Sequence, residues 1–210
     1  MYLNTIVAVR SRSCHVKTMH TLLRINLMCI ENQVQHEISY VNDDTHDKIE
    51  MINNKIKGVY DKILFLDFGV FIDEESLKQV FEKHTCLVFP AVKFGINWDM
   101  FKSKMIHNVN EPASQAGLEF DTDVSKKISD GIYKVTDTNP KTWVMDPKLV
   151  QKALKGKKGE GMYKSRSIKD LFDHLVLKLT VTAFTKAKIS VSYSHECVSN
   201  ILEAAGVKVS

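Results

Sequence analysis

The sequence of 210 residues contains little cysteine, no long hydrophobic run and no large excess of one charge. Its four cysteines lie far apart without a Cys-x-x-Cys pair, which argues against a zinc knuckle and against a disulfide framework. No apolar run approaches the roughly 20 residues of a membrane-spanning helix, and the first residues lack the basic and apolar regions of a signal peptide. We therefore expect a cytoplasmic protein with no membrane span.

The composition indicates one globular domain. Apolar residues make up 44% of the chain and charged residues 26%, which is typical of a domain with its own hydrophobic core. The net charge is only +4, and the lysine cluster at 152–166 contains a single aromatic residue, so we expect no nucleic-acid surface but a local phosphate site. We treat residues 1–210 as one domain, which could be the N-terminal part of a longer chain.

The first half of the chain alternates strand and helix patterns. Strands are predicted at 5–9, 37–41, 62–66 and 86–89, with helices between them that begin near Val16, Asp44 and Asp73. In the first helix, apolar residues recur every three or four positions, a pattern typical of a helix face: Val16, Met19, Leu23, Leu27 and Ile30. This order predicts an open, mainly parallel α/β sheet flanked by helices, with a less regular half after residue 92.

Polar residues end three of the predicted strands. The apolar run Ile63–Leu66 suits a strand buried on both faces, and Asp67 follows it directly. Right-handed crossovers would bring Arg10, Asp43 and Asp67 to one edge of the sheet, where open α/β sheets bind ligands. We therefore expect a nucleotide site at this edge, with Asp67 as a functional residue.

Two other families have similar motifs but require residues that this sequence lacks. The letters Asp67-Phe68-Gly69 match a protein-kinase magnesium motif, but the glycine-rich loop, strand lysine and catalytic loop of a kinase are absent from the sequence. A haloacid-dehalogenase-type phosphatase needs two aspartates before its Gly-Val pair. Aligned on Gly69, those positions hold Leu66 and Phe68, so the nucleophile is missing.

The segment 37–77 resembles the nucleotide-sugar half of a GT-A glycosyltransferase, especially the family-2 type. Val41-Asn42-Asp43-Asp44-Thr45-His46-Asp47 is similar to that family's Val-Asn/Asp-Asp-Gly-Ser-Thr-Asp signature. Leu64-Phe65-Leu66-Asp67-Phe68-Gly69 is similar to its Phe-Leu-Asp-x-Asp strand end. The resemblance covers about residues 4–92. The chain also resembles the glycosyltransferases that large algal viruses encode. The resemblance implies a GT-A-like fold, with a nucleotide-sugar half at 1–92 and an acceptor side at 93–210.

The resemblance also implies an activity. The chain would transfer a sugar from a UDP-sugar to a glycan or glycoprotein hydroxyl, with Mn²⁺ or Mg²⁺ bridging the diphosphate as a Lewis acid. The residues that would bind the nucleotide sugar are Ala8, Val9, Arg10, Asp43, Asp44, Asp67, Phe68, Gly69, Lys158 and Arg166.

The family's metal ligands and catalytic base are matched less completely by this sequence. Asp67 and a late histidine, His195, would bind the metal, but the family's second aspartate is Gly69 here. In the order of motifs along the chain, Asp170 lies nearest to the place of the family's catalytic base. Asp121 and Asp123 are the two other candidates for this base. Two alternatives stay open: a phosphatase or nucleotidyltransferase on a doubly wound sheet, and a non-catalytic nucleotide-sugar or glycan-binding domain.

Overall fold

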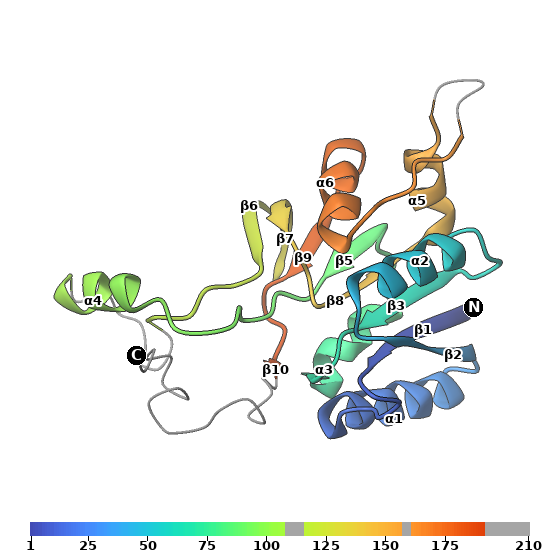
Figure 1. The fold of residues 1–210 in the computed structure, drawn as a ribbon, viewed down its shortest axis with the longest axis horizontal. Coiled ribbons are helices and arrows are strands. Elements are labelled where there is room, and N and C mark those ends of the chain that lie inside the picture. The colour runs from blue at the N-terminus through green and yellow to red at the C-terminus, as the bar shows by residue number, and fades with distance from the viewer. Residues whose placement is uncertain (108–115, 157–160, 192–210) are drawn as a thin grey trace.

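In the computed structural model, residues 1–107, 116–156 and 161–191 are described, and the first half alternates strands with helices (Figure 1). Its elements are β1 (Tyr2–Val9), α1 (Val16–Glu31), β2 (Gln35–Asn42), α2 (Thr45–Lys55), β3 (Lys62–Leu66), β4 (Val70–Ile72), α3 (Glu74–Leu77), the 3₁₀ helix η1 (Lys78–Val80) and β5 (Cys86–Val88). The second half contains α4 (Trp98–Ile106), β6 (Thr122–Ser129), β7 (Ile132–Thr138), β8 (Thr142–Met145), α5 (Pro147–Leu154), α6 (Ile168–Lys178), β9 (Thr182–Phe184) and β10 (Ile189–Val191).

An eight-stranded sheet in the order β2-β1-β3-β8-β5-β9-β7-β6 forms the centre of the fold. β2, β1, β3, β5, β9 and β6 run in one direction, whereas β8 and β7 run in the other. The predicted mainly parallel α/β sheet is therefore confirmed. β4 and β10 form a separate antiparallel pair.

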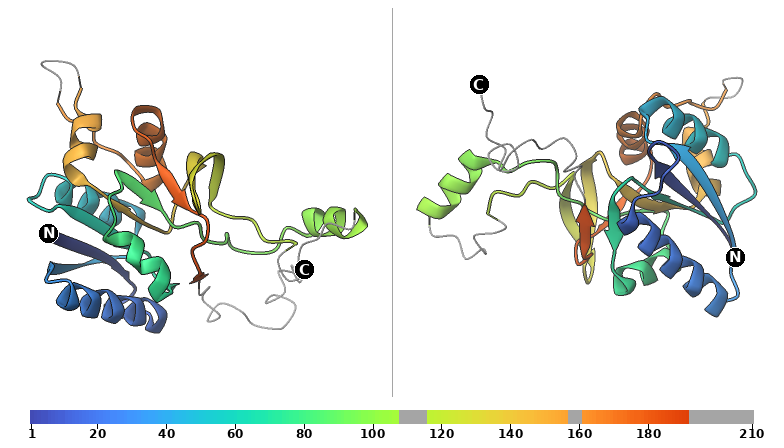
Figure 2. Two further views of the ribbon diagram at one scale, coloured as in Figure 1. Left: turned by 180° about the vertical axis from the view of Figure 1, so that it is seen from behind. Right: turned by 60° about the horizontal axis from the view of Figure 1, so that its bottom comes forward.

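Helices cover both faces of the sheet. α1 and α3 pack on one face through a core cluster that includes Ile25 and Leu77. α2, α5 and α6 cover the other face, where Ile52, Val150 and Leu175 join a second cluster. Figure 2 shows α4 standing apart from the sheet, and α4 buries none of its residues. No helix in the described ranges has the length and apolar character needed to span a lipid bilayer.

The strand β8 corrects the sequence prediction at the centre of the sheet. We expected the strand at 86–89 to continue the parallel set after β3, but β8 lies between β3 and β5 and is antiparallel to both. Trp143 of β8 is fully buried, and its ring stacks on that of Phe65 with a centroid distance of 5.4 Å. The four-residue run is buried throughout, so it lacks the alternation that marks a half-exposed strand.

The starts of α2 and α3 agree with the predicted positions at Asp44 and Asp73, and α5 is capped in the same way. The side chains of Asp44, Asp73 and Asp146 each accept a hydrogen bond from backbone N–H groups in the first turn of α2, α3 and α5. The helix after Asp73 is shorter than expected, because α3 passes into η1 after one turn.

The apolar face predicted for α1 is exposed. Leu23, Leu27 and Ile30 are 57%, 59% and 67% exposed, respectively. The buried face is instead formed by Thr18, Thr21, Leu22, Ile25 and Cys29. The threonines are buried because their hydroxyl groups bond to the segment after β3, as described below.

Candidate active site at the strand ends

The three polar strand ends lie together, as predicted. β1 pairs in parallel with β2 on one side and with β3 on the other, so the carboxyl ends of these strands share one edge of the sheet. Arg10, Asp43 and Asp67 are the residues directly after these strands. The prediction that these three residues share one edge of the sheet is therefore confirmed, and their function stays a prediction.

Lys48 of α2 joins the carboxylates at this edge. Its Nζ donates to Asp67 Oδ1 at 2.7 Å and to Asp43 Oδ1 at a shorter distance. Arg10 Nε donates to Asp43 Oδ2 at 2.5 Å. The Lys48, Asp43 and Asp67 side chains are only 12%, 10% and 18% exposed. The Arg10 side chain is 53% exposed. Two cations and two carboxylates thus form one network, which we call the strand-end cluster, and all but Arg10 are largely buried.

The pKa shifts of Lys48 and Asp43 favour the charged form of both side chains. Burial lowers the pKa of Lys48, but attraction by Asp67 and hydrogen bonds to Asp43 and Asp67 outweigh it, so the net shift is upward. Burial raises the pKa of Asp43, but hydrogen bonds from Lys48 and Arg10 outweigh it, so the net shift is downward. Lys48 therefore stays protonated and Asp43 ionised near neutral pH.

The segment after Asp67 is a tight turn. Val70 N donates to Asp67 O at 3.3 Å, and Gly69 has φ of +80°, a conformation that side chains disfavour. Thr18 of α1 fixes the turn, because its Oγ1 accepts from Gly69 N at 2.9 Å and donates to Asp67 O at 3.3 Å. Phe68 lies under the Arg10 guanidinium, which is 4.5 Å from the ring centroid.

A cavity of about 220 Å³ opens beside Asp67. Lys48, Lys141, Lys169 and Asp67 line it. The Lys169 ammonium pairs with Asp137 and Asp173, which do not line the cavity. Ser167, the N-cap of α6, also lines it. We call it the basic cavity, and its full lining is Thr45, Lys48, Asp67, Asn139, Pro140, Lys141, Ser167, Ile168 and Lys169. Lys48, Lys141 and a helix N-terminus together favour an anionic ligand.

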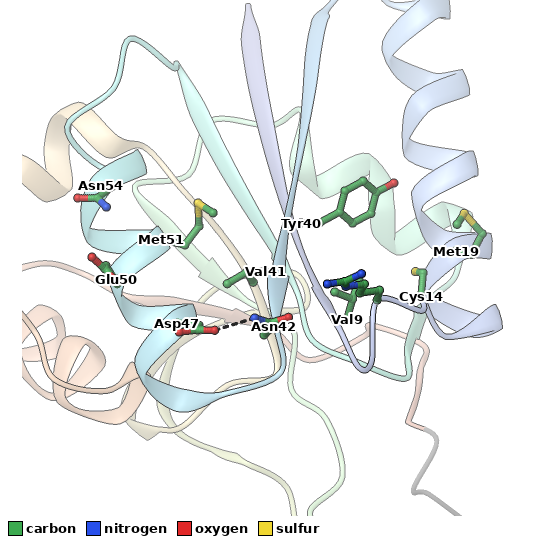
Figure 3. Close-up of a pocket in the computed structure, with 11 residues that line it drawn as sticks. Val9, Cys14, Met19, Tyr40, Val41, Asn42, Asp47, Glu50, Met51 and Asn54 are labelled. Atoms are coloured by element: carbon green, nitrogen blue, oxygen red, sulfur yellow. Dashed lines mark hydrogen bonds between the residues drawn. The ribbon is translucent and has the colours of Figure 1, made fainter.

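The larger cavity, of about 700 Å³, lies elsewhere, around the free edge of β2. Figure 3 shows Tyr40 and Met19 to one side of β2, and Met51 and Glu50 to the other. Of the residues predicted to bind a nucleotide sugar, only Val9 contributes to it. Asp67 and its partner Lys48 line the smaller, basic cavity, and Lys48 also bonds to Asp43 at the neighbouring strand end, so we place the candidate site there.

The other predicted binding residues occupy varied places. Ala8 is fully buried in β1, and Asp44 caps α2 by accepting from His46 N and Asp47 N. Arg166 is exposed, and its backbone N–H donates to Asp170 Oδ2 at 2.8 Å. Lys158 and His195 lie outside the described residues.

The three predicted candidates for the base differ in environment. Asp170 follows the α6 residues that line the basic cavity, and it accepts from Tyr163 OH at 2.7 Å. Asp121 is buried and accepts from Ala91 N and Lys141 N, so it anchors backbone beside the cavity. Burial outweighs these hydrogen bonds and raises its pKa. Asp123 is exposed on β6. The catalytic role of each stays a prediction.

The described residues do not form a metal-ligand set. Within residues 1–107, 116–156 and 161–191, no three His, Cys, Asp or Glu side chains are placed to hold one metal ion. Oδ1 of Asp67 accepts from Lys48, and the second aspartate position is the turn residue Gly69. Carboxylates tied to an ammonium are poor partners for Mn²⁺ or Mg²⁺, which need several free oxygen ligands. The described side chains at this edge therefore do not fit a bound Mn²⁺ or Mg²⁺.

The sequence analysis missed the lysines of the basic cavity. Lys48 lies four residues after the helix cap Asp44, which places it one turn into α2 on the side facing the strand ends. Lys141 and Lys169 come from segments more than 70 residues further along the chain. The helix pattern could have indicated Lys48, but only the folded sheet brings the other two to the cavity.

No protein-family model matches the sequence, and no curated protein sequence matches it. The fold is similar to that of a UDP-glucose pyrophosphorylase solved with UDP-glucose, with a TM-score of 0.52, 9% identity and 98% of each chain covered. A Drosophila beta-1,4-galactosyltransferase 7 mutant, solved with manganese, UDP-Gal and xylobiose, has a TM-score of 0.48 and 13% identity over 95% of this chain and 74% of its own. TarS from S. aureus has a TM-score of 0.45 and 14% identity, over 93% of this chain and 61% of its own. The last two scores establish no common topology, and the first likeness shows the fold of this chain but not its reaction.

Proposed function

We propose that this chain is a glycosyltransferase that takes a nucleoside-diphosphate sugar, with UDP as the nucleotide, and transfers the sugar to a glycan or glycoprotein hydroxyl. The observation that carries the proposal is the strand-end cluster beside the basic cavity. A charged network at the carboxyl edge of parallel strands lies at a usual ligand position in such sheets. The similarity to a pyrophosphorylase that binds UDP-glucose supports a nucleotide-sugar ligand.

The diphosphate would lie in the basic cavity. Lys48 and Lys141 would face its charge, and the α6 N-terminus would add backbone donors. The nucleoside would extend toward the ends of β1 and β2, where Arg10 and Asp43 lie. This placement uses every member of the strand-end cluster.

The reaction would be a displacement at the anomeric carbon. The bond from that carbon to the β-phosphate oxygen breaks, and UDP leaves with the electron pair. The acceptor hydroxyl oxygen forms the new bond, and its proton passes to a carboxylate base. Asp170 is the candidate that follows the cavity-lining residues of α6 directly. The lysines would stabilise the charge that develops on the departing UDP.

Nucleotidyl transfer, the main alternative, is less well supported by the loop after β1. Cradles for nucleotide phosphates use glycine-rich loops with free backbone N–H groups. Here the loop contains no glycine, and its hydrogen bonds close on themselves, with Arg10 N to Ser13 O at 3.1 Å and Ser13 N to Arg10 O at 2.8 Å.

Calorimetric titration with UDP, UMP, GDP and ADP tests the proposal. We expect UDP to bind at least about tenfold more tightly than UMP, and Arg10→Ala and Asp43→Asn each to weaken UDP binding by about tenfold or more. Asp61→Asn is the matched control, because Asp61 also pairs with a lysine but lies away from this edge, beside Lys148. Equal affinity for UDP and UMP, or equal losses in all three variants, would refute a diphosphate site at the strand ends.

A further inference from the structure

We infer that Lys48, rather than a divalent cation, supplies the positive charge that faces the donor diphosphate. The inference rests on the proposed function, since it assumes a nucleoside-diphosphate sugar in the basic cavity. It assigns to a side chain the place that the family resemblance gives to Mn²⁺ or Mg²⁺.

The first support is the position of the Lys48 ammonium. It bonds to Asp67, the one carboxylate of the expected metal pair that the sequence retains, at 2.7 Å. It also bonds to Asp43, the carboxylate at the neighbouring strand end. A metal ion on Asp67 would have to displace this nearly buried ammonium from both carboxylates. Removing one partner from a buried ion pair leaves an uncompensated charge, so the displacement is unfavourable.

The second support is the turn after Asp67. The position of the second metal aspartate is held by Gly69 at φ of +80°, where an aspartate side chain would be strained. Thr18 fixes this turn through both Gly69 N and Asp67 O. The backbone is thus shaped for a glycine, and the metal pair is replaced by one carboxylate with a lysine.

The third support is the donor capacity that remains. An ammonium group has three N–H donors, and the two carboxylates accept two of them. Lys48 also lines the basic cavity, so its third donor can reach a phosphate oxygen there. Lys141 lines the same cavity and adds charge. Asp121 fixes the backbone of Lys141 by accepting from its N–H at 3.2 Å.

Calorimetric titration with UDP, once with Mn²⁺ and once with EDTA, tests the inference on the wild-type chain, Lys48→Met, Lys48→Arg and Lys55→Met. Lys55 is the matched control, because it lies on the same helix and pairs with Glu37 away from the cavity. We expect wild-type affinity to agree within about twofold between the two conditions. Lys48→Met should bind UDP at least about tenfold more weakly in both, whereas Lys48→Arg and Lys55→Met should retain most of the affinity.

The outcomes separate this inference from the proposed function. UDP binding that requires Mn²⁺ and is abolished by EDTA would overturn the role of Lys48 and leave the proposed function standing. Absence of UDP binding in both conditions would overturn the proposed function, and the inference with it. If Lys48→Met fails to fold, the Mn²⁺ resonance spectrum of the nucleotide-free wild-type chain decides: we expect the signal of free Mn²⁺ to stay undiminished, and its loss would overturn the inference.

Discussion

Lys62, the first residue of β3, offers a test of the buried charge in this fold. Lys62 is only 8% exposed, and its Nζ donates to Val80 O at 2.6 Å and to Glu82 O. Burial lowers its pKa from 10.5 to about 8, a shift that nearby Glu82 and Asp146 only partly oppose. The native state therefore holds this proton less tightly than the unfolded chain does.

The size and sign of the effect follow from the shift. The pKa falls from 10.5 to about 8 on folding. Below pH 8 the charged Lys62 therefore lowers the free energy of unfolding by about 3 kcal/mol. Between about pH 8 and 10.5 the unfolded state binds more protons than the native state, so the free energy of unfolding rises with pH in this window. Below pH 8 both states are protonated, and the contribution is constant.

Urea unfolding of the wild type and Lys62→Met at pH 7, 8, 9 and 10 measures this contribution. Subtraction of the two curves removes the titration of all other groups. We expect the stability of the wild type relative to Lys62→Met to increase by about 2–3 kcal/mol from pH 7 to 10. Lys102→Met, in which an exposed lysine of α4 is lost, is the control for removal of one charge. A difference between wild type and Lys62→Met that does not change with pH would refute the burial of a charged Lys62.

Two further pairs of substitutions test local features of the fold. Leu23→Ser on the exposed face of α1 should change the free energy of unfolding by no more than about 0.5 kcal/mol. Ile25→Ala on the buried face should lower the free energy of unfolding by about 2–5 kcal/mol. Similar losses in the two variants would contradict the observed orientation of the helix. Gly69→Ala should lower the free energy of unfolding by about 1–2 kcal/mol because of the positive φ, whereas Gly161→Ala, which meets open space, should change it little; equal effects in thermal denaturation would count against the tight turn.

Local sequence patterns predicted the first half of the sheet and the location of the strand ends. The run Ile63–Leu66 is continuous because β3 is buried on both faces, and the helix caps Asp44 and Asp73 are set by local chemistry. These features depend on residues that are close in the sequence. They could therefore be read without knowledge of the fold.

The insertion of β8 could not be predicted in the same way. It depends on pairing between Phe65 and Trp143, which are distant in sequence. The hairpin of β6 and β7 was also missed, because β6 is exposed along seven of its eight residues and shows no apolar alternation.

The orientation of α1 was hidden by its polar contacts. Thr18 and Thr21 face inward because their hydroxyl oxygens accept from Gly69 N and Ile72 N in the segment after β3. A hydrophobic pattern cannot show such bonds, so the apolar stripe that includes Leu23 was misleading. Lys48 was missed for a related reason, since its role depends on the two carboxylates that the fold brings to it.

The central claim is that a nucleoside diphosphate binds at the strand ends and in the basic cavity. Titration of ¹⁵N-labelled protein with UDP, followed by amide chemical shifts, tests this claim most directly. We predict that the largest changes occur at Arg10, Asp43, Lys48 and the first turn of α6. Changes confined to the cavity at the free edge of β2, around Tyr40, would contradict the account.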